Sequence, residues 1–239
     1  MGFFGRKKEN KTIHMELSGF PGDTQTDKCL LMAKEKGVQL NVKLLDVLEG
    51  ACEQQDYRAI SPFGKCPCLK EGSFVTSGAT SILAYLDVRG QGGQLNPKKA
   101  AILGHQNYWV QIATQIAEPA VKTLMQESIC GPMKDSSYAA SEELMGTASE
   151  KLQQVLDALD GQLADKGFIV GEYSYADIHW TSIAHLYVLL REGVLLGEAD
   201  LIESRKHVSA WYKRVQARPS FTSLPTLDDI KQKQLRSVA

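Results

Sequence analysis

At positions 61–69 the sequence reads Ser61-Pro62-Phe63-Gly64-Lys65-Cys66-Pro67-Cys68-Leu69. A short helix or turn is expected just before this stretch, over residues 54–60. Just after it, the strand-like segments 68–70 and 73–75 flank Glu71-Gly72, a pair that is typical of a hairpin turn. The stretch therefore predicts a proline-containing loop that leads from a helical segment into two antiparallel strands.

Strand-like and helical segments alternate throughout the first 90 residues. A strand is expected over 13–18, a helix over 24–36 that ends at Gly37, a second strand over 40–46 and a helix over 79–87. Together with the loop and the hairpin, these segments give the order β-α-β-α-β-β-α.

The sequence changes character near residue 90, where strand patterns end and helical periodicity takes over. Helices are expected over 97–127, 136–164, 175–192, 199–203 and 205–217, and Pro119 is expected to kink the first of them. The stretch 89–94, rich in Gly and Gln, predicts a linker. The predicted organisation is a basic tail (1–11), an α/β domain (12–89), a linker (90–96), a helical domain (97–227) and a C-terminal tail (228–239).

Composition and charge exclude several classes of protein. Of the 239 residues 43% are apolar and 23% are charged, and the net charge is −1, so no bulk attraction to nucleic acid or anionic membrane is expected. There is no apolar run of 18 residues, and the basic N-terminus lacks the apolar stretch of a signal peptide. We therefore expect a cytoplasmic protein with no membrane span and no nucleic-acid partner.

The five cysteines, Cys29, Cys52, Cys66, Cys68 and Cys130, are odd in number and irregularly spaced. No Cys-x-x-Cys pair occurs, and the five histidines are scattered, so no metal site is predicted. Free thiols in a reducing compartment are the default expectation.

Three stretches carry a family resemblance: residues 61–69 followed by Glu71-Gly72, residues 167–177 and residues 207–221. In this order and spacing they resemble the phi-like members of the cytosolic glutathione transferase superfamily. The resemblance implies an α/β thioredoxin-like N-terminal domain followed by an all-α C-terminal domain. It also implies a cis peptide bond before Pro67, with the backbone of Cys66 facing the cysteinyl part of glutathione. In the second stretch, Ser174 and Asp177 have the spacing of a capping box at a helix start.

The resemblance also identifies the positions at which the family holds glutathione, and the side chains found there differ. The catalytic serine falls on Asp23, which cannot donate a hydrogen bond when ionised. A His-Lys pair that binds the glycine carboxylate falls on Cys52 and Glu53, and a Glu-Ser pair that binds the γ-glutamyl end falls on Gly78 and Ala79. The family's loop glutamine is Lys65, which could recover some affinity for an anion. These changes predict a degenerate site and no bound cofactor, with glutathione retained only in an active protein.

Several residues remain as weak candidates for thiol activation. Thr24 follows Asp23, Ser18 ends the first strand, and Cys66 lies in the loop. A Cys52–Cys66 pair or a single reactive thiol is a further alternative, against the more common interpretation of cysteines as small buried apolar residues.

Three functions therefore remain open. The favoured hypothesis is a non-catalytic structural or interaction module on the transferase fold. The alternatives are an active glutathione S-transferase with an atypical activating residue and a small-molecule binding protein that uses the cleft between the domains. The resemblance implies a homodimer or a subunit of a larger assembly. Phe63 is either an apolar key for such an interface or an ordinary core residue.

Overall fold

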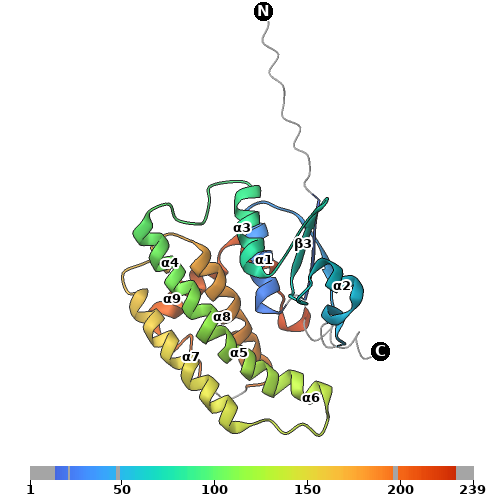
Figure 1. Cartoon of the computed structure of the whole chain (residues 1–239). Coiled ribbons are helices and arrows are strands. Elements are labelled where there is room, and N and C mark those ends of the chain that lie inside the picture. The colour runs from blue at the N-terminus through green and yellow to red at the C-terminus, as the bar shows by residue number, and fades with distance from the viewer. Residues whose placement is uncertain (1–13, 21, 47–48, 196–198, 230–239) are drawn as a thin grey trace, which may run out of the picture.

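The computed structural model describes residues 14–229, except 21, 47–48 and 196–198. The predicted tail 1–11 and all but two residues of the predicted tail 228–239 lie outside the described residues. Figure 1 shows an α/β part and a helical part side by side. This is the two-part architecture expected from the sequence.

The N-terminal part contains a four-stranded sheet with the order β2-β1-β3-β4. Strand β1 (Met15–Gly19) runs parallel to β2 (Leu40–Leu44) and antiparallel to β3 (Cys68–Glu71), which pairs antiparallel with β4 (Phe74–Ser77). The helices are α1 (Thr24–Glu35), α2 (Gln55–Ile60) and α3 (Ala79–Arg89), with a short 3₁₀ turn η1 (Ala51–Glu53) before α2. The predicted order β-α-β-α-β-β-α is confirmed.

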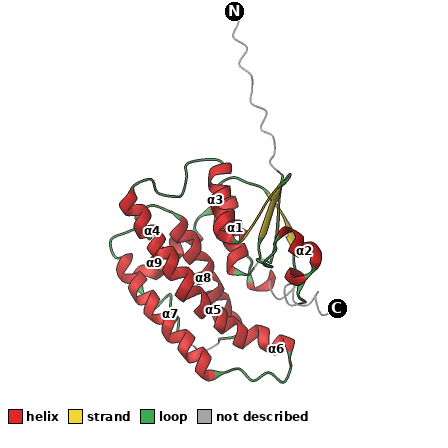
Figure 2. Ribbon diagram, in the orientation of Figure 1, coloured by secondary structure: helices red, strands yellow, loops and turns green. Residues whose placement is uncertain are grey.

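Helices α1 and α3 lie together on one side of the sheet, and α2 lies on the other (Figures 1 and 2). The arrangement follows from the burial of apolar side chains on facing surfaces. Leu17 of β1 and its partner Leu69 of β3 have no exposed surface, and Met32 of α1 packs with Leu83 and Leu86 of α3 in the same core. The removal of this apolar surface from water is the main force that holds the sheet against the two helices.

The helical part consists of α4 (Ala100–Ile112), α5 (Glu118–Met125), α6 (Gly131–Lys134), α7 (Glu142–Gln162), α8 (Tyr175–Gly193) and α9 (Lys206–Gln216). A 3₁₀ turn, η4 (Pro219–Ser223), follows α9. Helix α8 is buried along most of its length, because it lies between the two parts and contributes to both cores. Trp180 of α8 and Trp211 of α9 are the largest fully buried side chains of this part.

The first long helix differs from its expected form, a helix over 97–127 kinked at Pro119. It begins at Ala100, and its helical path continues to Lys134 through two π-helical segments, Ala113–Ala117 and Gln126–Cys130. The segments end just before Pro119 and near Pro132. A proline has no N–H to donate and its ring crowds the preceding turn, and a widened turn relieves both problems.

Two other helix expectations are corrected. The helix expected over 136–164 begins at Glu142, because Ser141 caps it by accepting a hydrogen bond from the Leu144 N–H. The segment expected to be a helix over 199–203 forms turns at residues 201–204. There the Asp200 side chain accepts hydrogen bonds from the N–H groups of Ile202 and Glu203, and this local bonding replaces the helical pattern.

The predicted capping box is confirmed at the start of α8. Asp177 Oδ2 accepts from the Ser174 N–H at 2.9 Å, and Oδ1 accepts from the Ile169 N–H at 3.1 Å and from Trp211 Nε1 at 2.9 Å. One buried carboxylate thus joins two of the sequence motifs, 167–177 and 207–221. Burial raises the pKa of Asp177 to about 6, although these hydrogen bonds oppose the rise.

Candidate functional site

The loop over residues 61–69 connects α2 to β3, and its conformation is fixed by hydrogen bonds. The peptide bond between Cys66 and Pro67 is cis, as expected. The Lys65 carbonyl accepts from the Tyr57 hydroxyl and from Ser61 Oγ, both at 2.9 Å, and the Pro67 carbonyl accepts from the Gly78 N–H at 2.8 Å. The loop is therefore anchored to α2 on one side and to the start of α3 on the other.

Gly64 allows the loop to approach η1 closely. Its φ of +64° is favourable for glycine, and a Cβ atom at this position would lie 3.0 Å from the Cys52 carbonyl oxygen. The loop and η1 are consequently in contact, and this brings Cys52 to the same region as Cys66.

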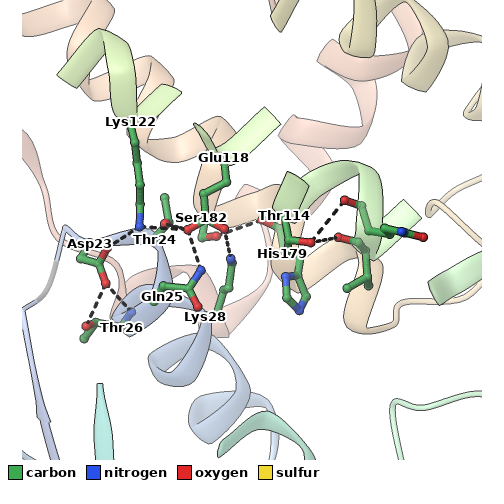
Figure 3. Close-up of polar contacts among 12 residues, drawn as sticks. Asp23, Thr24, Gln25, Thr26, Lys28, Thr114, Glu118, Lys122, His179 and Ser182 are labelled. Atoms are coloured by element: carbon green, nitrogen blue, oxygen red, sulfur yellow. Dashed lines mark hydrogen bonds and ion pairs between the residues drawn. The ribbon is translucent and has the colours of Figure 1, made fainter. Parts of the chain in front are cut away.

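Asp23 is the N-cap of α1 and stands at the position expected for the catalytic serine (Figure 3). Its Oδ2 accepts from the Thr26 N–H at 3.2 Å, and its Oδ1 lies 3.1 Å from the ammonium nitrogen of Lys122 in α5. Both carboxylate oxygens are therefore engaged within the protein. An ionised carboxylate in this place accepts hydrogen bonds and has none to donate to a thiolate.

The carboxylate of Glu118 in α5 contacts several other polar groups at this end of α1 (Figure 3). Its carboxylate accepts from the Thr24 hydroxyl, from Gln25 Nε2 at 2.6 Å and from the buried ammonium of Lys28 at 2.6 Å, and Lys122 lies 3.1 Å away. Burial alone would raise the pKa of Glu118, but the Lys28 and Lys122 ammonium groups lower it to about 2. The cluster is an ionic contact between the α/β part and the helical part.

Thr24, one of the weak candidates for thiol activation, lies within this contact. Thr24 has no exposed surface, and its hydroxyl donates to Glu118 across the domain boundary. In this arrangement the hydroxyl is directed at a carboxylate of the protein itself. Ser18, the second candidate, is 4% exposed and lies in β1 opposite Cys68.

Cys66, the third candidate, is partly exposed at the loop. Burial raises the pKa of its thiol to about 12, and the carboxylate of Asp23 acts in the same direction. The thiol is therefore protonated at neutral pH and is a weak nucleophile in that form.

The two remaining pairs of positions, Cys52-Glu53 and Gly78-Ala79, offer no cationic side chain for glutathione. Cys52 and Glu53 lie in η1, where the Glu53 carboxylate is exposed and pairs with Arg58 at 3.1 Å. Gly78 is the N-cap of α3 with no side-chain cap, and Ala79 begins the helix and is buried. Asp23 and Cys52 therefore lie near Cys66 at the loop. The Gly78 N–H donates to the Pro67 carbonyl, and the side chain of Lys65 is exposed.

The Glu118 cluster is the feature that sequence reasoning missed. Its members in α1 and its members in α5 are some 90 residues apart, as in the contact between Lys28 and Glu118, and no local pattern links the two groups. One signal was present in the sequence. Lys28 stands among Cys29, Leu31 and Met32 on a helix with an apolar buried face, and a lysine there requires a buried acidic partner.

Other kinds of site receive no support from the described part of the chain. Within it, no group of three or more His, Cys, Asp or Glu side chains is placed to hold a metal ion. None of its helices combines the length and the apolar character that crossing a membrane requires. A surface pocket of ≈ 510 Å³ lies beside α4 in the helical part, and it is lined by residues that include Tyr108, Trp109 and Gln162.

Comparison with known proteins gives consistent matches in sequence and structure. Residues 24–89 match the family model "Glutathione S-transferase, N-terminal domain", and residues 112–219 match "Glutathione S-transferase, C-terminal domain". The chain is 30% identical to glutathione S-transferase F10 of Arabidopsis thaliana over 78% of its own length and 85% of the relative. It is 29% identical to a glutathione S-transferase of Silene vulgaris over 87% and 94%. Among solved structures, glutathione transferase F7 from Populus trichocarpa superimposes with a TM-score of 0.75 at 23% identity, over 87% of this chain and 96% of that one.

Proposed function

The chain belongs to the glutathione S-transferase family, and from this premise we propose that it keeps the family scaffold as a binding or interaction module with little or no thiol-activating chemistry. The observation that carries the proposal is the set of contacts made by the Asp23 carboxylate. The residue at the N-terminus of α1 is a carboxylate already bonded to Thr26 and Lys122. The hydroxyl of the next residue, Thr24, is buried and donates to Glu118.

The side chains around the loop indicate that the affinity for glutathione is low. Glu53 carries a negative charge where the family presents a cation, and Gly78 and Ala79 carry no polar side chain. A hydrogen bond to a charged group contributes about 1.5–3 kcal/mol, so the loss of two such bonds lowers affinity by about 100-fold or more. The backbone of the cis-proline loop remains able to receive a peptide.

Isothermal titration of the full chain with glutathione tests this proposal directly. We expect a dissociation constant in the millimolar range or no measurable heat, together with very low turnover of a standard aryl halide. Micromolar binding with turnover at the level of an authentic transferase would overturn the proposal. An authentic phi-like transferase measured in parallel is the positive control.

The second candidate is an active glutathione S-transferase with an atypical activating group. The curated relatives carry transferase names, and the cis-proline loop is retained, and both observations favour it. Thr24 is poorly placed for the role because it is buried. The Lys122 ammonium, which is partly exposed beside Asp23, is the cation at this end of α1 that could donate to a thiolate. In this case turnover would be substantial in the wild type and would fall sharply in Lys122→Met.

A homodimer is the assembly we propose on the basis of the family resemblance. Phe63 is 85% exposed in the isolated chain, so it is not an ordinary core residue. An aromatic side chain held out from a fixed loop is suited to insertion into an apolar recess of a second subunit.

A further inference from the structure

Cys52 and Cys66 form a pair of neighbouring thiols at the cis-proline loop, although 13 residues separate them in the sequence. Both pack against the same small cluster of Leu45, Tyr57 and Cys68. The close approach of Gly64 to the Cys52 carbonyl holds η1 against the loop, and the two thiols lie close enough for each to influence the pKa of the other.

The pair differs from the other three cysteines in its access to solvent. Cys29 and Cys68 are buried, whereas Cys52 and Cys66 are both partly exposed. Cys130 is partly exposed as well, but it lies in the helical part at the end of the second π-helical segment. Among the described residues, Cys52 and Cys66 are thus the two thiols that combine mutual contact with access from outside.

We propose that Cys52 and Cys66 form a redox-active dithiol that small disulfides oxidise to an intramolecular disulfide. The inference does not depend on glutathione binding, because it rests on the contact between the two thiols and on their exposure.

The oxidation takes place in two thiol–disulfide exchange steps. The Cys52 thiolate attacks one sulfur of a small disulfide RSSR, forms a mixed disulfide with R, and releases RS⁻. The Cys66 thiolate then attacks the Cys52 sulfur, the bond to R breaks, and a second RS⁻ leaves. The two protein thiols lose two electrons to RSSR, and their two protons pass to the released thiolates through solvent.

The surroundings of the two thiols indicate which of them attacks the disulfide first. The interaction between the two side chains lowers the pKa of Cys52 and raises that of Cys66, so it favours the thiolate form of Cys52 and disfavours that of Cys66. Burial and the Asp23 carboxylate also raise the pKa of Cys66 to about 12, whereas the pKa of Cys52 is raised chiefly by burial. Cys52 is therefore the attacking thiol and Cys66 the resolving one. Because the pKa of each thiol is raised above the ordinary value of 9.0, the reaction rate rises about tenfold per pH unit between pH 7 and 9.

Peptide mapping of the full chain after oxidation tests the proposal. The reduced protein is treated with hydroxyethyl disulfide, a small disulfide without peptide groups, and then alkylated and digested with trypsin without reduction. Trypsin places Cys52 in peptide 44–58, and Cys66 and Cys68 in peptide 66–70. We expect these two peptides to be covalently linked in the wild type and equally in Cys68→Ser, whereas Cys130 gives only a mixed disulfide with the reagent.

The variants of the pair separate the two steps. In Cys66→Ser we expect the mixed disulfide to accumulate on Cys52, and in Cys52→Ser we expect Cys66 to react at least tenfold more slowly than Cys52 does in the wild type. The proposal is overturned if the wild type gives no linked peptides, if the link is lost in Cys68→Ser, or if Cys52 reacts no faster than Cys130. The wild-type map decides the matter even where a variant fails to fold.

Discussion

The ammonium nitrogen of Lys28 in α1 lies 2.6 Å from Oε2 of Glu118 in α5, and the exposed fractions of the two side chains are 0% and 5%. This ion pair joins the two parts of the molecule near the N-terminal end of α1, which Asp23 caps. Its position explains why the hydroxyl of Thr24 and the amide of Gln25 turn toward Glu118.

Removal of one partner of this pair is expected to destabilise the protein strongly. Glu118→Ala leaves the Lys28 ammonium buried without its acidic partner, and this costs about 3–5 kcal/mol of unfolding free energy. Urea denaturation followed by circular dichroism measures the loss. Glu53→Ala is the matched control, because its pair with Arg58 is exposed and is worth only about 0–1 kcal/mol. Equal losses in the two variants would contradict the assignment.

The same carboxylate is expected to make stability depend on pH in the acid range. The pKa of Glu118 is lowered from an ordinary value of 4.5 to about 2, because Lys28 and Lys122 outweigh the opposing effect of burial. Its contribution is therefore fully present above pH 4.5 and is lost as the pH falls toward 2. A shift of this size corresponds to a contribution on the order of 3 kcal/mol.

Unfolding free energies measured between pH 2 and pH 6 test this expectation. In Glu118→Gln we expect the unfolding free energy to fall less steeply than in the wild type as the pH falls from 4.5 toward 2, whatever the absolute stability of the variant. Parallel curves for the wild type and Glu118→Gln would show that another group is responsible.

Under the proposed function, Asp23→Ser is expected to increase thiol activation at the start of α1. Serine is also a favourable N-cap, so the helix loses little stability, while a hydroxyl donor replaces a carboxylate. We expect kcat/KM for an aryl halide with glutathione to rise at least tenfold. Asp23→Ala is the control, since it removes the charge without supplying a donor. An equal gain in both variants would assign the effect to charge, and no gain in Asp23→Ser would contradict the proposed reason for low activity.

Phe63→Ser is expected to weaken the proposed homodimer without destabilising the subunit. The side chain is 85% exposed, so its removal changes the stability of the isolated subunit by about 0.5 kcal/mol or less. Sedimentation velocity should show a monomer at concentrations where the wild type is a dimer. Leu144→Ser, which alters an exposed apolar residue of α7, should leave the assembly unchanged. A wild-type monomer, or a Phe63→Ser dimer of full affinity, would exclude this use of Phe63.

Much of the fold could be read from local pattern, because each element carries its own periodicity and its own end signals. Gly37 follows α1, Ser174 and Asp177 cap α8, and the loop at 61–69 leads into the β3–β4 hairpin as expected. The misplaced boundaries lie where local hydrogen bonds or prolines override periodicity, at Ser141, Asp200 and Pro119. A pattern of apolar residues does not contain these competing interactions.

The chain of 239 residues thus carries its two-part architecture in the order of its residues, since capping, alternation and family motifs are all local in sequence. The contact of Lys122 with Asp23 and the burial of Thr24 against Glu118 arise only when the two parts fold together, and the proximity of Cys52 to Cys66 arises only when the α/β part folds. Each of these contacts joins residues from different elements. Their energies come from burial and from opposite charges at close distance, and only the packed molecule provides those conditions.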